Sequence, residues 1–331
     1  MTEDPSKPTV GEVGSVEPKR DAAQMSRLDL LRAGVAGLTG ITVLGALTGA
    51  GCASERLVRD GAPPKTDPKL IKFREVSQFS PDFHWIRGLC TDGTSLWVAG
   101  DMAVREFAID GTRRLTHELP GAAKCVAWSP DGRLFAATDD RVHPIGEEGT
   151  WSSLGPRARI VSIVADARQV VVADAGNRCV VRFDHQGTEI GRFGAKSADY
   201  PGLVVPSPYI GLSLHPSGDL VVTNIGRHRV ERHGPDGRLV EAVGEPGMGM
   251  DAFCGCCNPT HVSVLPNGDM VTAEKGLPRV KVISPDGSLK CVVAGPECFH
   301  TETLGLATAA MGSRVLVLDP WEGAVRVFAP V

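Results

Sequence analysis

The sequence is poor in aromatic residues and has no long run of basic residues. Aromatic side chains make up 5% of the 331 residues, and the formal net charge is -4. A surface that stacks nucleic-acid bases needs exposed aromatic rings, and one that follows the phosphate backbone needs clustered Lys and Arg. Both are scarce here, so nucleic acid is not an expected partner.

The periodicity of a long amphipathic helix is also lacking. The chain is instead rich in turn-forming residues, with 39 Gly and 24 Pro, which suits a fold with many short strands. These expected strands belong to a repeated unit, because residues 217–244 recur 50 residues later as residues 267–294. Both copies contain a Pro-Asp-Gly turn, at Pro235–Gly237 and Pro285–Gly287, and a fainter copy surrounds Val171. Self-similarity at a fixed period indicates an array of one structural unit.

Each unit predicts β-strands joined by tight turns, because Asp-Gly reaches positive φ at little cost. The units are about 44 residues apart, which is the length of a four-stranded propeller blade. They begin near Ser80, Ala122, Arg159, Tyr209, Thr260 and Thr301. The sequence therefore predicts an all-β, six-bladed β-propeller over residues 69–331. The last unit has room for three strands, so Leu70–Val76 is expected to join it and close the ring.

Three segments carry a resemblance to a known family: Val171–Asp184, Val221–Gly237 and Val271–Gly287 resemble NHL repeats. The domain is thus similar to six-bladed propellers of the NHL type. Because NHL propellers include protein-binding modules and enzymes, the resemblance implies a fold and leaves the function open.

The N-terminal part is predicted to direct export. Residues 1–52 are interpreted as an export signal behind a disordered polar extension, and residues 53–68 as a linker. Ala33–Ala50 is apolar and uncharged, and it follows Ser26–Arg32, which resembles a twin-arginine signal in which Leu28 replaces the second arginine.

A lipid anchor is the preferred interpretation of the end of this signal. Leu47–Cys52 resembles a bacterial lipoprotein box in which Cys52 is lipidated, although Gly49 stands where leucine is usual. A cleaved secretory signal and an uncleaved membrane anchor are the alternatives. In each case we expect an extracytoplasmic protein, periplasmic or at the cell surface. The lipidated and the uncleaved-anchor interpretations also predict a membrane anchor at the N terminus.

Propeller topology sorts the loops onto two faces. The Pro-Asp-Gly turns share one face, whereas the loops between second and third strands share the other with the crossovers between blades. Long, unusual loops on one rim are typical of binding sites. Arg227, His228, Lys275 and Tyr209 are expected on that rim, as candidates for binding an anionic small molecule or a partner protein. Arg229 and Arg279 are expected to brace neighbouring loops.

The same rim carries a cysteine cluster, Cys254, Cys256 and Cys257, with Cys298 on a neighbouring crossover. Three hypotheses are open. A disulfide within this loop or to Cys298 is preferred, because thiols outside the cytoplasm tend to pair. A metal or cluster site is the second, although Cys-x-Cys-Cys lacks common zinc spacing. A redox-active thiol pair is the third.

His84, His261 and His300 lie at or just before the predicted innermost strands of three neighbouring blades. Three imidazoles near the axis could hold zinc or iron with an open coordination position. This arrangement resembles the peptidyl-hydroxyglycine lyase branch of NHL propellers, where a zinc lies in the central channel. Alternatively, the histidines only hydrogen-bond crossover loops. The leading function is therefore partner or ligand binding on the Cys-rich face, and the alternative is a metal-dependent lyase or hydrolase.

Overall fold

The computed structural model describes residues 64–147 and 149–331. The predicted export signal, the lipidation site Cys52 and most of the predicted linker lie outside the described residues. Among the described residues, no helix is both long and apolar enough to cross a membrane.

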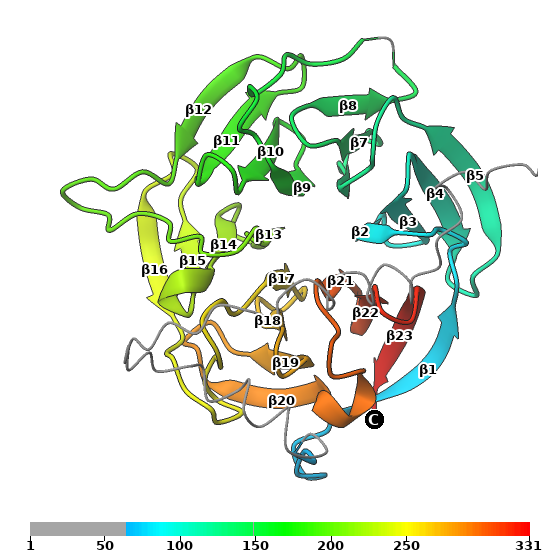
Figure 1. Ribbon diagram of the computed structural model, residues 1–331, viewed down its shortest axis with the longest axis vertical. Helices are drawn as coiled ribbons and strands as arrows, with labels where there is room; N and C mark the ends of the chain where they lie inside the picture. Colours follow the sequence, from blue (N-terminus) through cyan, green and yellow to red (C-terminus); the bar gives the residue numbers. More distant parts are fainter. Residues whose placement is uncertain (1–63, 148) are drawn as a thin grey trace, which may run out of the picture. The chain divides into compact units, whose positions relative to one another are not determined.

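The described chain forms six antiparallel sheets that surround a central axis, each running from the axis to the rim (Figure 1). The fold is a six-bladed β-propeller, as predicted. Strands are given from the axis outward. The first blade consists of β2 (Ile86–Thr91), β3 (Ser95–Gly100), β4 (Ala103–Ala108) and β5 (Arg113–Glu118), the second of β6 (Cys125–Trp128), β7 (Leu134–Ala137) and β8 (Val142–Ile145), and the third of β9 (Ile160–Ala165), β10 (Gln169–Asp174), β11 (Cys179–Asp184) and β12 (Glu189–Phe193). The fourth blade consists of β13 (Leu212–Leu214), β14 (Leu220–Asn224), β15 (Arg229–His233) and β16 (Leu239–Val243), the fifth of β17 (His261–Val264), β18 (Met270–Glu274), β19 (Arg279–Ile283) and β20 (Leu289–Ala294), and the sixth of β21 (Ala307–Met311), β22 (Arg314–Asp319), β23 (Ala324–Pro330) and β1 (Phe73–Phe79).

The second strands are apolar on both faces because each blade packs between two others. β10 (QVVVAD) and β14 (LVVTN) are buried along their whole length. Toward the rim one face meets solvent, so β5 (RRLTHE) is largely exposed. The core is accordingly divided into apolar layers between adjacent blades, and sequence runs rich in Val, Leu and Ala mark the strands that fill them.

An N-terminal strand closes the ring. β1 pairs with β23 in antiparallel register from Phe73 opposite Pro330 to Phe79 opposite Val325. This confirms the predicted closure, but the strand begins three residues later than the segment Leu70–Val76. Ile71 instead forms a parallel bridge with Val292 of β20, because the chain passes the fifth blade before it reaches the sixth.

The second blade has three strands among the described residues, a departure that the repeat did not indicate. After β8 the chain continues as a loop whose Trp151 N–H donates to the Val142 carbonyl at 3.2 Å. The Trp151 ring is buried against Phe135 and Phe183. This loop covers part of the edge that a fourth strand would otherwise occupy.

The Pro-Asp-Gly turns lie on one face of the ring. Gly237 and Gly287 have φ values of +85° and +87°, a conformation that favours glycine. They connect the third and fourth strands of their blades. The crossovers and the loops between second and third strands lie on the opposite face, which we call the crossover face.

Candidate functional site

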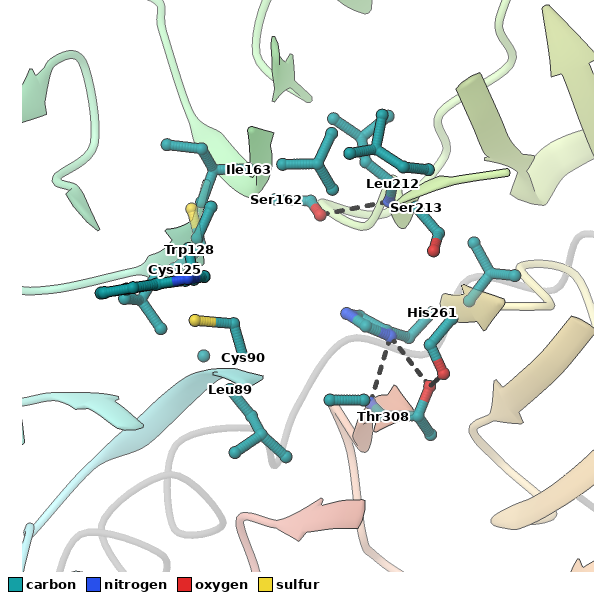
Figure 2. Close-up of a pocket in the computed structure, with 18 of the residues that line it drawn as sticks. Leu89, Cys90, Cys125, Trp128, Ser162, Ile163, Leu212, Ser213, His261 and Thr308 are labelled. Carbon is teal, nitrogen blue, oxygen red and sulfur yellow. Dashed lines mark hydrogen bonds between the residues drawn. The ribbon is translucent and has the colours of Figure 1, made fainter. Parts of the chain in front are cut away.

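An axial channel runs through the ring and opens on the crossover face. Its mouth is a cavity of about 290 Å³, and its inner section is a cavity of about 220 Å³ lined by the innermost strands. Arg87, Val161 and His261 line both sections, so the two are continuous. Figure 2 shows side chains of several blades around the inner section, with His261 facing Cys90 across it.

Polar residues at the end of the second strands hold the loops around the mouth. In the first blade the Asp101 carboxylate accepts hydrogen bonds from the backbone N–H groups of His84 and Trp85, at 2.9 and 2.8 Å. The corresponding pairs elsewhere are Asp174 with the N–H of Arg159, Asn224 with that of Val204, Glu274 with that of Cys254, and Asp319 with those of Trp321 and Glu322. The repeat thus fixes the backbone of the crossover face as well as the blades.

His261 is fixed at the junction of the two channel sections. Its Nδ1 accepts a hydrogen bond from the Thr308 backbone N–H at 3.2 Å and lies 3.3 Å from the Thr308 hydroxyl. Burial lowers the pKa of His261 to about 4, so the ring is neutral at pH 7. Since Nδ1 accepts a backbone N–H, the proton of the neutral ring lies on Nε2. Figure 2 shows this second nitrogen pointing toward the middle of the channel, where it offers a hydrogen-bond donor.

The mouth also carries positive charge. Arg87 and Lys124 line it, and no Asp or Glu of the described chain lines either section of the channel. Lys124 forms an ion pair with Asp139 at 3.2 Å, outside the lining. Burial raises the pKa of Tyr209, an effect that the Arg87 charge opposes, so the phenol stays protonated at neutral pH. The mouth therefore presents several donors and little competing negative charge.

The four residues predicted to bind a ligand have two different roles. Tyr209 lines the mouth, and the Lys275 ammonium lies 5.1 Å from the centre of its ring. Arg227 instead donates to the carbonyls of Gly202 and Pro201, at 3.2 and 3.1 Å. His228 pairs with the Gly255 carbonyl at 2.6 Å. The last two brace crossovers. Lys275 also contacts a crossover, because its ammonium donates to the Ser207 hydroxyl at 3.1 Å. Of the four predicted residues, Tyr209 is the one that lines the described channel mouth.

The two arginines that were expected to brace loops also differ. Arg279 donates to the carbonyls of Gly249 and Ala252 at 3.1 and 2.8 Å, which confirms the expectation. Arg229, at the equivalent position in the preceding blade, is exposed to solvent.

No disulfide joins the cysteines of the described chain, so the preferred interpretation, a disulfide within this loop or to Cys298, is not borne out. The sulfur atoms of Cys256 and Cys257 lie 3.1 Å apart. Burial, followed by the Glu274 charge, raises the pKa of Cys254 to about 11. This thiol stays protonated at neutral pH, which makes it a poor nucleophile.

The three candidate histidines do not gather on the axis. The ring of His84 makes an edge-on contact with Trp85, centroid to centroid 4.8 Å, and His300 stacks on Trp321 at 3.8 Å. No group of three or more His, Cys, Asp or Glu side chains in the described part of the chain is placed to hold a metal ion. A metal-bound histidine usually donates its other N–H to an acceptor, whereas Nδ1 of His261 accepts one. As arranged, these residues do not fit zinc or iron, and metal binding stays a prediction of the sequence alone.

Sequence reasoning missed Arg87, Lys124 and Trp85 at the mouth. A signal was available, because each lies within two residues of the start of an innermost strand, as His261 does. The inner end of each blade lines the axis, so a charged or aromatic residue there is a candidate for the channel mouth.

No protein-family model and no curated protein matches this sequence. Solved structures resemble its fold. Virginiamycin B lyase from Staphylococcus aureus is 13% identical over 78% of this chain and 89% of that chain, with a TM-score of 0.52. The WD40 β-propeller domain of Doa1 is 13% identical over 78% and 97%, with a TM-score of 0.53. A structural genomics protein from Bacteroides thetaiotaomicron is 14% identical over 84% and 74%, with a TM-score of 0.56. At these identities the comparisons establish the fold alone, that of a β-propeller.

Proposed function

We propose that this protein is a binding scaffold of the NHL type whose channel mouth takes a small ligand with an anionic group beside an apolar group. The observation that carries the proposal is the composition of the mouth. Arg87, Lys124 and the Nε2–H of His261 supply positive charge and donors, and no described carboxylate lines the channel.

The apolar part of the ligand has matching walls. Trp85, Leu304 and Pro208 line the mouth beside the donors. Small-molecule sites typically combine apolar walls with a few placed polar groups. An anion that accepts from a guanidinium makes a charge-assisted hydrogen bond, which is stronger than a neutral one. A ligand of this class would place its anion near Arg87 and His261 and its apolar group against Trp85.

Binding of 1-anilinonaphthalene-8-sulfonate, an anionic aromatic dye, tests the proposal. We expect one dye per chain, with Arg87→Gln weakening binding about 10-fold or more, because a hydrogen bond to a charged group contributes about 1.5–3 kcal/mol. Fluorescence titration measures the affinity. Arg229→Gln, which removes an exposed arginine that does not line the mouth, should bind like the unmodified protein.

An uncharged analogue of the dye, N-phenyl-1-naphthylamine, isolates the contribution of the anion. The sulfonate should bind more tightly to the unmodified protein, and Arg87→Gln should remove that preference. Equal affinities of the two dyes, or equal losses in the Arg87 and Arg229 variants, would contradict an anion-binding mouth.

The alternative function is a metal-dependent lyase or hydrolase in the channel. Its support is the fold shared with virginiamycin B lyase, of which a histidine-to-alanine variant is catalytically inactive. The Nε2–H of His261 suits donation to a ligand better than proton abstraction or metal binding. We therefore favour the binding scaffold.

We further propose that the scaffold is exported and tethered to a membrane through a lipid on Cys52. Cys52→Ser should then move the protein from the membrane to the soluble fraction, because one lost acyl anchor removes the main membrane attachment. Fractionation followed by immunoblotting measures this. Cys298→Ser, which replaces an exposed cysteine of the propeller, is the control. Retention of the Cys52 variant in the membrane would favour an uncleaved anchor at Ala33–Ala50.

A further inference from the structure

Exposed large apolar side chains are concentrated on the crossover face. Of eleven such residues in the described chain, six lie on this face, four on β1 or outer strands of other blades and one at the C terminus. The six are Trp85, Met102, Val204, Met248, Leu304 and Trp321. Of the eleven, only the C-terminal Val331 lies toward the face with the Pro-Asp-Gly turns. Apolar residues grouped on one face mark an interaction surface more often than scattered ones do.

Four of the six lie on the loops of the sixth and first blades, on one side of the channel mouth. We call Trp85, Met102, Leu304 and Trp321 the apolar crescent. Trp85 and Leu304 line the channel mouth together with Pro320, the neighbour of Trp321. Met102 follows Asp101, whose carboxylate holds the backbone of Trp85. The four side chains are between 38% and 56% exposed.

The crescent is held in shape before any partner arrives. The Trp321 indole stacks on the His300 ring, with 3.8 Å between centroids and 4° between planes. The loop that carries Trp321 is tied to Asp319 through two backbone N–H groups. Trp side chains dominate the binding energy of many interfaces, and a rigid surface loses less entropy on binding. These features suit a protein partner.

The charges beside the crescent indicate the kind of partner. Glu302 and Glu322 are exposed and lie close in sequence to His300 and Trp321. Their carboxylates would attract Lys or Arg in an arriving segment and repel Asp or Glu. Arg87 borders the crescent on its inner side, at the mouth. A bound segment would therefore place its basic residues beside Glu302 and Glu322 and away from Arg87.

We propose that the apolar crescent binds a segment of a partner protein in which aromatic or aliphatic side chains are flanked by Lys or Arg. This goes beyond the small-ligand site, because Met102 and Trp321 do not line the channel. It also differs from the Cys-rich crossover, which lies between the fourth and fifth blades.

The probe is a phage library of random dodecapeptides, selected against the full chain. Selected peptides should combine apolar residues with Lys or Arg, and synthetic copies should bind in fluorescence-polarisation titrations. Trp321→Ser and Leu304→Ser should each weaken binding by tenfold or more. Met248→Ser, an exposed apolar residue on the same face outside the crescent, should bind like the unmodified chain.

A charge variant gives a second measurement. The double variant Glu302→Lys/Glu322→Lys should bind the peptides more weakly at low salt, and the difference should shrink as salt rises. Acidic selected peptides, or unchanged binding by the Trp321 and Leu304 variants, would overturn the proposal. The proposal would also be overturned if a second copy of the chain covered the crescent and prevented peptide binding. A preference for anionic vesicles over every selected peptide would overturn it as well.

Discussion

Deleting residues 1–79 is expected to destabilise the propeller severely, whereas deleting residues 1–63 is not. The longer deletion removes β1, which pairs with β23 along its length. It also removes Glu75, which forms an ion pair with the largely buried Arg326 at 2.6 Å. The exposed edge of β23 would then be free to pair with other chains. We expect a melting temperature at least about 10 °C lower, measured by circular dichroism, or aggregation.

A pair of point variants on β1 reports on the same closure without opening the ring. Phe73 is 9% exposed and packs into the core between the fifth and sixth blades, so Phe73→Ala should cost about 3–5 kcal/mol of unfolding free energy. Val76, on the same strand, is 47% exposed, so Val76→Ala should cost less than about 0.5 kcal/mol. Equal losses in urea denaturation would mean that β1 does not contribute to the core as the structure places it.

The closing strand β1 shows how much of the fold can be predicted from the sequence alone. A run of apolar residues before the first unit indicated that a strand was available, and the short last unit indicated that one was needed. Local pattern could not fix its register, because Leu70 and Phe79 are both apolar. The register is defined by the pairing of β1 with β23, from Phe73 opposite Pro330 to Phe79 opposite Val325, and these contacts join residues far apart in sequence. The described residues of the second blade form three strands, and this departure likewise depends on the packing of Trp151, which the local sequence does not show.

The site was less predictable than the fold, because it depends on the paths of the crossovers. Topology correctly placed Arg227 and Lys275 on one face. It could not show that the Arg227 guanidinium reaches back to the Gly202 carbonyl, or that His300 stacks on Trp321 instead of turning toward the axis. Periodicity identifies a rim, but the direction of a side chain on that rim depends on loops that do not repeat.

Glu274→Ala is expected to be among the most damaging single substitutions in the described propeller. Glu274 accepts from Arg279 at 2.7 Å and lies 3.1 Å from the Lys281 ammonium, and all three side chains are almost fully buried. Its second oxygen accepts the Cys254 N–H. Without the carboxylate, two cations would remain buried without a counter-charge. Removing one partner of a buried ion pair costs about 3–5 kcal/mol, which urea denaturation can measure.

The surface pair Arg232–Glu241 provides the matched control. Its oxygen and nitrogen lie 3.0 Å apart, but the Glu241 side chain is 41% exposed. Glu241→Ala should cost less than about 1 kcal/mol, because solvent screens an exposed pair. If the two glutamate variants lost the same stability, burial of the Glu274 cluster would not be what makes it important.

Lys281→Met separates the charge balance of this cluster from its hydrogen bonds. Burial lowers the pKa of Lys281, so the folded protein holds this proton less tightly than the unfolded chain, and the charged lysine itself costs stability at neutral pH. Methionine avoids that cost and leaves Glu274 paired with Arg279 alone. It gives up the hydrogen bonds to the Met250 and Ala252 carbonyls, at 2.9 and 2.6 Å, but Arg279 still donates to Ala252.

The loss for Lys281→Met should therefore be about 1–2 kcal/mol, well below that for Glu274→Ala. The order of the two losses distinguishes two accounts of the crossover formed by residues 245–259. If the lysine variant is the less stable one, the crossover is held mainly by lysine hydrogen bonds to its carbonyls. If the glutamate variant is the less stable one, as we expect, the carboxylate is the part that cannot be replaced. It neutralises both cations and fixes the backbone that carries Cys254.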